Sequence, residues 1–122
     1  MRRLAQRVDI HVVTADTFGT AEKELEGLPL ICRRLNAEKE DVQRARYAEK
    51  LNPHCVASFG NGNNDRLLLK VVKEAGGLAI AVENGEGCAL EAILNANLLV
   101  VGAVNALDLL LEPTRLRATL RF

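Results

Sequence analysis

Apolar positions along this chain follow two different periods, and their alternation predicts strands and helices in turn. Short runs rich in β-branched and other apolar residues predict strands at 9–14, 30–32, 55–59, 78–82 and 98–101. Apolar residues three or four positions apart predict helices at about 17–26, 40–51, 65–75, 88–94 and 105–111. Residues 1–7 have the pattern of a last helical turn, and a final turn follows Pro113. Strands alternating with helices are typical of a parallel sheet covered on both faces, so we expect a doubly wound, three-layer α/β fold.

Length and composition favour one globular domain. The chain has 122 residues, 48% of them hydrophobic, which is enough to bury a core, so we expect a single domain spanning 1–122. Its 16 basic and 16 acidic residues cancel, and only 3% of residues are aromatic. This balance argues against a nucleic-acid surface, which would show excess basic charge and stacking side chains.

The remaining composition signals point to a cytoplasmic protein. Cys32, Cys55 and Cys88 are widely spaced and form no metal-ligand pattern, so we expect reduced thiols and no zinc site. The longest apolar region, 90–111, is interrupted by acidic residues and asparagines and predicts no membrane span. His11 and His54 have no nearby partner pattern, and we interpret both as structural.

The loop at 60–65, Gly-Asn-Gly-Asn-Asn-Asp, is the stretch around which the chain is organised. It follows a predicted strand and opens a predicted helix, and ligands of parallel α/β sheets bind beyond the carboxyl ends of strands. Asn61 and Asp65 would point into such a crevice. No Gly-Lys-Ser/Thr follows, so it is not a P-loop, and Asp65 replaces the third glycine of a dinucleotide fingerprint. A plain Asn/Gly turn with Asp65 capping the helix remains an alternative.

Three segments together resemble the haloacid-dehalogenase-like superfamily, and within it the small soluble P-type-ATPase-like proteins. His11 to Thr20, His-Val-Val-Thr-Ala-Asp-Thr-Phe-Gly-Thr, is similar to the family's second motif, and the loop at 60–65 is similar to its fourth. Asp108-Leu-Leu with 115–121 resembles its C-terminal signature. The likeness covers nearly the whole chain and implies a HAD-like Rossmannoid sheet.

The resemblance implies Mg²⁺-dependent phosphoryl transfer, such as phosphate-ester hydrolysis, through an aspartyl-phosphate. Thr14, with backbone groups at Ala15 and Gly62, would bind phosphate, while Asp65 and Asn61 would hold or orient Mg²⁺. Asn61 stands where many relatives carry aspartate and is a weaker donor for a hard cation, although the soluble subgroup also tends to carry asparagine there. The third motif's lysine is replaced by Arg44, which keeps the charge with a forked geometry, and Lys39 or Lys50 is the alternative cation. These assignments give catalytic roles to Thr14, Arg44 and Asp65.

The family's first motif, Asp-x-Asn/Asp-Gly-Thr, does not precede Thr14 in this sequence. The resemblance places that nucleophile strand at the centre of the sheet, so we expect a truncated, inactive chain, a strand-completing partner or homo-oligomer, or two strand edges packed directly together. Asp16 fits Asp-x-x-Gly-Thr, but no later strand ends in a phosphate-binding Ser/Thr before Gly60, so we interpret it as a decoy. The alternative function is a non-catalytic α/β module that binds phosphate, a nucleotide or a protein. Neither the enzyme hypothesis nor the binding-module hypothesis identifies a substrate.

Overall fold

The computed structural model describes residues 8–14, 31–35, 38–111 and 120. The chain divides into two compact units, Met1–Glu40 and Asp41–Phe122, and each is described by itself. The predicted helix at 17–26, the first turn and the turn after Pro113 lie outside the described residues. The prediction of a single domain therefore stays a prediction.

The first unit contains a two-stranded parallel sheet. Strand β1 (His11–Thr14) pairs with β2 (Ile31–Arg34), with His11 opposite Ile31 and Thr14 opposite Arg34. The Ile31 N–H also donates to the Ile10 carbonyl at 2.7 Å, which extends the pairing by one residue. Strand β2 thus runs two residues beyond its predicted end.

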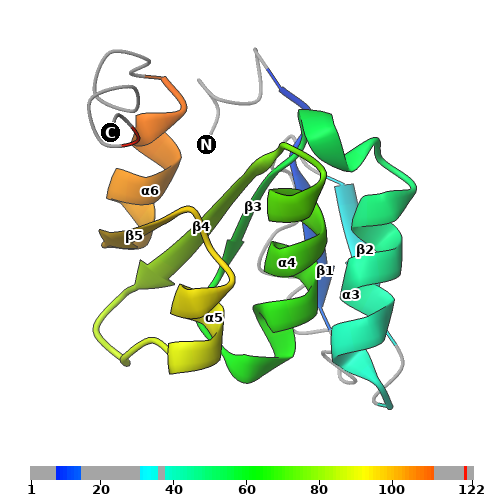
Figure 1. Cartoon of the computed structure of the whole chain (residues 1–122), viewed down its shortest axis with the longest axis horizontal. Coiled ribbons are helices and arrows are strands. Elements are labelled where there is room, and N and C mark those ends of the chain that lie inside the picture. Colours follow the sequence, from blue (N-terminus) through cyan, green and yellow to red (C-terminus); the bar gives the residue numbers. More distant parts are fainter. Residues whose placement is uncertain (1–7, 15–30, 36–37, 112–119, 121–122) are drawn as a thin grey trace. The chain divides into compact units, whose positions relative to one another are not determined.

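The second unit is built on a three-stranded parallel sheet in the order β3-β4-β5 (Figure 1). Its strands are β3 (Ala57–Gly60), β4 (Leu78–Glu83) and β5 (Leu98–Val101). The central strand β4 is an unbroken apolar run before Glu83, as expected for a strand buried on both faces. The predicted parallel pairing is confirmed in both sheets.

Helices cover both faces of the three-stranded sheet. On one face, helices α4 (Arg66–Glu74) and α5 (Leu90–Leu94) pack with β4 through a cluster of buried residues, namely Leu69, Ala79, Ala81, Ala92 and Ala96. On the other, α6 (Ala103–Leu109) places Ala106 against Ile80 and Val82. Alternate residues of β4 therefore serve opposite layers, which makes this unit a mixed α/β structure in three layers.

The segment before β3 corrects a predicted boundary. Helix α3 (Glu40–Glu49) lies beside α4 and ends two residues before the predicted limit (Figure 1). Asn52 then adopts a left-handed conformation (φ 58°) and Pro53 opens a short 3-10 helix, η1 (Pro53–Cys55). The prediction of a strand from Cys55 is wrong, because the Cys55 N–H donates to the Asn52 carbonyl at 2.8 Å and holds that residue in the turn. The strand begins at Ala57.

Two helix starts also differ from prediction. Helix α5 begins two residues later than expected, at Leu90, and α6 begins two residues earlier, at Ala103. Asn84 Oδ1 accepts from the Ala103 N–H at 3.0 Å and caps α6 from the loop that follows β4. Within the described ranges, each helix is too short or too polar to cross a membrane.

Candidate functional site

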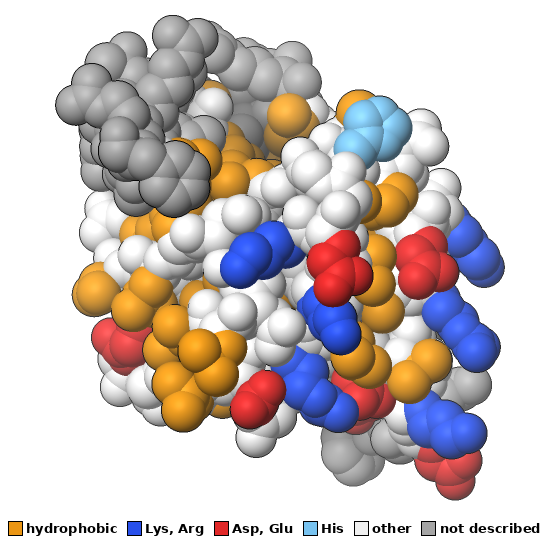
Figure 2. Space-filling model, in the orientation of Figure 1, with side chains coloured by type: hydrophobic (Ala, Val, Ile, Leu, Met, Phe, Trp, Pro, Cys, Tyr) orange, Lys and Arg blue, Asp and Glu red, His pale blue; other side chains and the backbone are white. Residues whose placement is uncertain are grey.

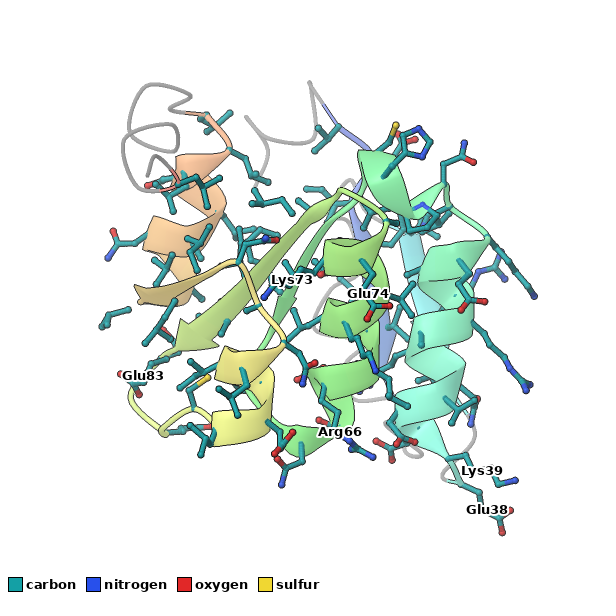
Figure 3. All side chains as sticks on the ribbon, in the orientation of Figure 1. Glu38, Lys39, Arg66, Lys73, Glu74 and Glu83 are labelled. Atoms are coloured by element: carbon teal, nitrogen blue, oxygen red, sulfur yellow. The ribbon has the colours of Figure 1, made fainter. Side chains whose placement is uncertain are left out.

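The predicted loop lies at the carboxyl end of β3, beside the loop that follows β4. After Gly60 the chain passes Asn61 and Gly62 and forms a 3-10 turn, η2 (Asn63–Asp65), which leads directly into α4. The Ala89 N–H donates to the Asn61 carbonyl at 2.7 Å and joins the two loops. Figure 3 shows Arg66, which starts α4, and Glu83, which ends β4, at the same end of this unit. This is the edge where ligands of parallel sheets bind.

Asp65 organises the loop through its carboxylate. Asp65 Oδ2 accepts hydrogen bonds from the Asn61 N–H at 3.0 Å and the Gly62 N–H at 3.1 Å. The Asp65 N–H in turn donates to the Gly62 carbonyl at 3.0 Å. Asp65 is 8% exposed and occupies the N-cap position of α4, yet its side chain makes no capping bond to that helix. The carboxylate instead turns back to the loop and closes a capping box on η2 through the Gly62 N–H. The plain-turn alternative is therefore confirmed as a turn, while a capping bond from Asp65 to α4 is not formed.

Gly60 leaves the space that this arrangement needs. A Cβ atom at position 60 would lie 2.5 Å from Asp65 Cβ and 2.6 Å from Asp65 Cγ, closer than carbon atoms approach without a bond. The Asp65 side chain therefore fills the volume that any other residue at position 60 would occupy. The glycine that ends β3 is a packing requirement for the Asp65 hydrogen bonds.

Arg44 and Asp65, which the sequence assigned to different motifs, form an ion pair. Arg44 Nη1 lies 3.9 Å from Asp65 Oδ1, and the two side chains are only 16% and 11% exposed. Reduced solvent screening makes such a pair stronger than one at the surface. Helix α3 thus brings a cation to the one carboxylate oxygen that the loop's N–H groups do not bind.

A second ion pair, which sequence reasoning missed, fixes α3 against the loop. Arg66 Nη2 donates to Asp41 Oδ2 at 2.9 Å, while Arg66 Nη1 donates to the Asn63 carbonyl at 2.7 Å. One guanidinium therefore joins the first turn of α3 to η2. The partners are 25 residues apart, and no local pattern in the sequence signals their contact.

Glu83 and Cys88 add polar groups to the same end of the sheet, and sequence reasoning gave neither of them a role. Glu83 Oε1 accepts from the Gly85 N–H at 2.6 Å and the Gly87 N–H at 2.9 Å. Burial raises the pKa of the Cys88 thiol, and the negative charges of Glu83 and Asp65 raise it further. Both the burial and the two carboxylates therefore disfavour a thiolate at Cys88.

The loop offers few oxygen donors to a Mg²⁺ ion, since Asp65 Oδ2 accepts two N–H groups and Asp65 Oδ1 faces Arg44. Asp65 Oδ1 is not used by the loop's own N–H groups, and the Asn61 side chain is exposed. Mg²⁺ commonly keeps several waters and binds one or two carboxylates together with substrate phosphates. Among the residues that the structure describes, no cluster of three His, Cys, Asp or Glu side chains could hold a metal ion. A bound ion here would depend on water and phosphate oxygens.

The phosphate-binding predictions are only partly covered by the described residues. Thr14 ends β1, but its side chain and the whole of Ala15 and Asp16 lie outside the described residues, so their roles stay predictions. Gly62 belongs to the loop, where its N–H already donates to Asp65. A phosphate at Gly62 would have to share that donor. The structure thus brings together Arg44, Asn61, Gly62 and Asp65.

Comparison with known proteins finds one relative of similar size. The chain is 40% identical over 86 residues to "Uncharacterized protein MJ0073" of Methanocaldococcus jannaschii, an alignment that covers 67% of this chain and 88% of that protein. No family model matches the chain. No solved structure matches it either.

Proposed function

We propose that this chain, which belongs to the same family as the Methanocaldococcus jannaschii protein MJ0073, is a phosphoryl-transfer domain of the haloacid-dehalogenase-like type. One observation carries the proposal. Arg44 and Asp65, placed by the resemblance in the third and fourth motifs, meet at 3.9 Å at the carboxyl end of a parallel strand. Nothing in the local sequence around either residue requires that contact.

The roles of these residues come from the resemblance, and their geometry is compatible with them. Arg44 would bind an equatorial phosphate oxygen, and its Asp65 partner would keep the guanidinium oriented. Asp65 also fixes the backbone of Asn61 and Gly62, so it acts first as the organiser of the loop. Asn61 and Asp65 Oδ1 would hold Mg²⁺, which when bound would neutralise charge on the phosphate.

The resemblance places a nucleophile strand between the segments that form β1 and β3. The family's reaction needs the aspartate on that strand, and the 122 residues do not supply it before Thr14. By itself this chain would bind phosphate and Mg²⁺ without turning over an ester.

A non-catalytic phosphate-binding or protein-binding module is the second candidate, favoured by the hydrogen bonds of Asp65. Both carboxylate oxygens already have partners, two N–H groups on Oδ2 and Arg44 near Oδ1, so the loop is ordered without any metal. Such a loop could serve anion binding alone. The two candidates differ in whether a supplied nucleophile produces turnover.

Mg²⁺-dependent hydrolysis of a generic aryl phosphate tests the proposal. The assay compares the 122-residue chain with the same chain carrying a family-like first-motif strand and helix fused before Met1. We expect turnover in the fused form only, and we expect Asp65→Ala to abolish it, with Glu74→Ala, an exposed carboxylate at the end of α4, as the matched control. A fused form that folds and binds phosphate without turnover would support the non-catalytic module instead.

Calorimetric binding of inorganic phosphate separates Arg44 from general basic charge. Arg44→Ala should weaken binding by at least about tenfold, as expected for loss of a charge-assisted hydrogen bond. Arg46→Ala changes an exposed arginine two residues away on the same helix and should leave binding unchanged. Equal weakening by both variants would count against a phosphate site at Arg44.

A further inference from the structure

Exposed large hydrophobic side chains concentrate around the outer edge of β5. Five occur within 15 residues, contributed by α5, β5 and the first turn of α6, and we call them the β5-edge surface. They are Leu90 (66% exposed), Leu94 (61%), Leu99 (46%), Val101 (67%) and Val104 (72%). Figure 2 shows hydrophobic side chains gathered over α5 and along the adjoining margin of the molecule.

The exposure of the two strand residues follows from the pleat of β5. Leu98 and Val100 pack into the cluster on the α6 side of the sheet. Because successive side chains point to opposite faces, Leu99 and Val101 lie on the face that α4 and α5 cover. Helix α5 has only five residues and leaves both largely uncovered.

The backbone of β5 also presents hydrogen-bonding groups at its outer edge. Gly102 N–H donates to the Glu83 carbonyl at 2.7 Å, and Val100 stands opposite Val82 in the ladder. Every second residue therefore directs its backbone toward β4, so the N–H and C=O groups of Leu99 and Val101 face outward. The Val101 carbonyl accepts from Asn105 Nδ2 at 3.0 Å, whereas β5 pairs with β4 alone among the described strands. The outward-facing N–H and C=O groups of Leu99 are therefore the centre around which a further strand could pair with β5.

We propose that the β5-edge surface is the interface of a twofold homodimer in which β5 pairs antiparallel with the β5 of a second copy, centred on Leu99. At the centre of such a pairing, Leu99 exchanges both N–H···O bonds with the partner's Leu99. The two α5 helices then lie on the same face of a continuous six-stranded sheet, with their apolar residues toward the twofold axis. A ligand or helix lying on one face would leave the strand edge unused.

Area and charge favour a second copy of this chain as the occupant. The five side chains expose on the order of 400 Å² of apolar surface, judged from the area that burial of a Val or Leu removes from water. A standard interface buries about 800 Å² per partner, of which roughly 60% is apolar, so this surface supplies most of that share. The formal net charge of the chain is zero, so two copies approach without overall repulsion. Asn95, Asn97 and Asn105 supply polar groups around it.

Sedimentation velocity of the full chain, from micromolar to near-millimolar concentration, tests the dimer. We expect a reversible dimer whose dissociation constant rises by at least about a hundredfold in Leu99→Lys, since the charge would be buried at the twofold axis. Ile31→Lys is the matched control, because Ile31 is an exposed strand residue (42%) outside this surface. It should change the dissociation constant by less than about twofold.

Leu99→Pro tests the strand pairing itself. Proline is tolerated on an edge strand where the N–H faces outward, so the fold should persist by circular dichroism while the pairing bonds are lost. A chain that stays monomeric throughout, or a dimer that Leu99→Lys does not weaken, would overturn the proposal. A folded Leu99→Pro variant that dimerises as tightly as the parent would overturn pairing through β5. None of these results depends on phosphate chemistry, so they are independent of the proposed function.

Discussion

At the scale of single residues, the site is a set of acidic groups with different partners. Asp65 bonds two backbone N–H groups and faces Arg44, whereas Glu83 closes its own loop through Gly85 and Gly87. The two carboxylates therefore stabilise their own loops before any ligand binds. Cys88 is the neighbour whose ionisation reports on them.

The ionisation of Cys88 should depend on Glu83. The raised pKa keeps the Cys88 thiol protonated to a higher pH than an ordinary cysteine, and alkylation requires the thiolate. The rate of iodoacetamide labelling at Cys88 should therefore reach half its maximum at an alkaline pH. Glu83→Gln removes one negative charge and should move that midpoint to lower pH. Peptide mass spectrometry across a pH series measures it.

Glu86→Gln provides the control for this titration. Glu86 is an exposed carboxylate in the same loop and is not among the causes of the Cys88 shift. The Glu86→Gln substitution should leave the pH of half-maximal Cys88 labelling unchanged. Equal midpoints in the parent chain and in Glu83→Gln would contradict the electrostatic role assigned to Glu83.

At the scale of elements, the β3–α4 connection depends on Gly60. Gly60→Ala should lower the free energy of unfolding by about 3 kcal/mol, since the new Cβ overlaps Asp65 and forces its carboxylate from the loop. Gly76→Ala places a methyl group in open space and meets only the strain of a left-handed backbone (φ 88°), about 1 kcal/mol. Urea denaturation of both variants compares them. Similar losses would mean that Asp65 moves aside at little cost.

The boundaries of these elements were predictable only where neighbouring residues determine them. Strand β5 lies at the predicted residues, 98–101, because an asparagine and a glycine delimit a short apolar run. The start of α6 was misplaced because its cap, Asn84, comes from a loop 19 residues earlier. Local periodicity contains no such information, so boundaries fixed by tertiary contacts could not be predicted.

The part of the candidate site that belongs to the resembled motifs was predictable from the sequence. Arg44, Asn61, Gly62 and Asp65 were named from the sequence, and the structure brings them together at one strand end. The Arg66–Asp41 pair was not predicted because an ion pair across 25 residues leaves no trace in composition or period. The predicted HAD-like identity stays a proposal, while the parallel α/β architecture of the second unit is confirmed.

At the scale of the whole molecule, the buried core that the structure describes belongs to the second unit. Every buried hydrophobic residue in the described part of the chain lies between Ala45 and Leu109. The described residues of the first unit form one two-stranded sheet, and a pair of strands by itself is at best marginally stable. Residues 41–122 also contain both ion pairs of the site.

We therefore expect a fragment of residues 41–122 to fold without the first unit. It should unfold in one cooperative urea transition, and amide protons of β4, the central strand, should be its most protected against exchange. Leu69→Ala in the fragment should lower its stability by about 2–5 kcal/mol, because Leu69 is fully buried against β4. That loss would show that the transition reports on this core. A fragment without a cooperative transition, or one indifferent to Leu69→Ala, would mean that the core of the second unit depends on residues 1–40.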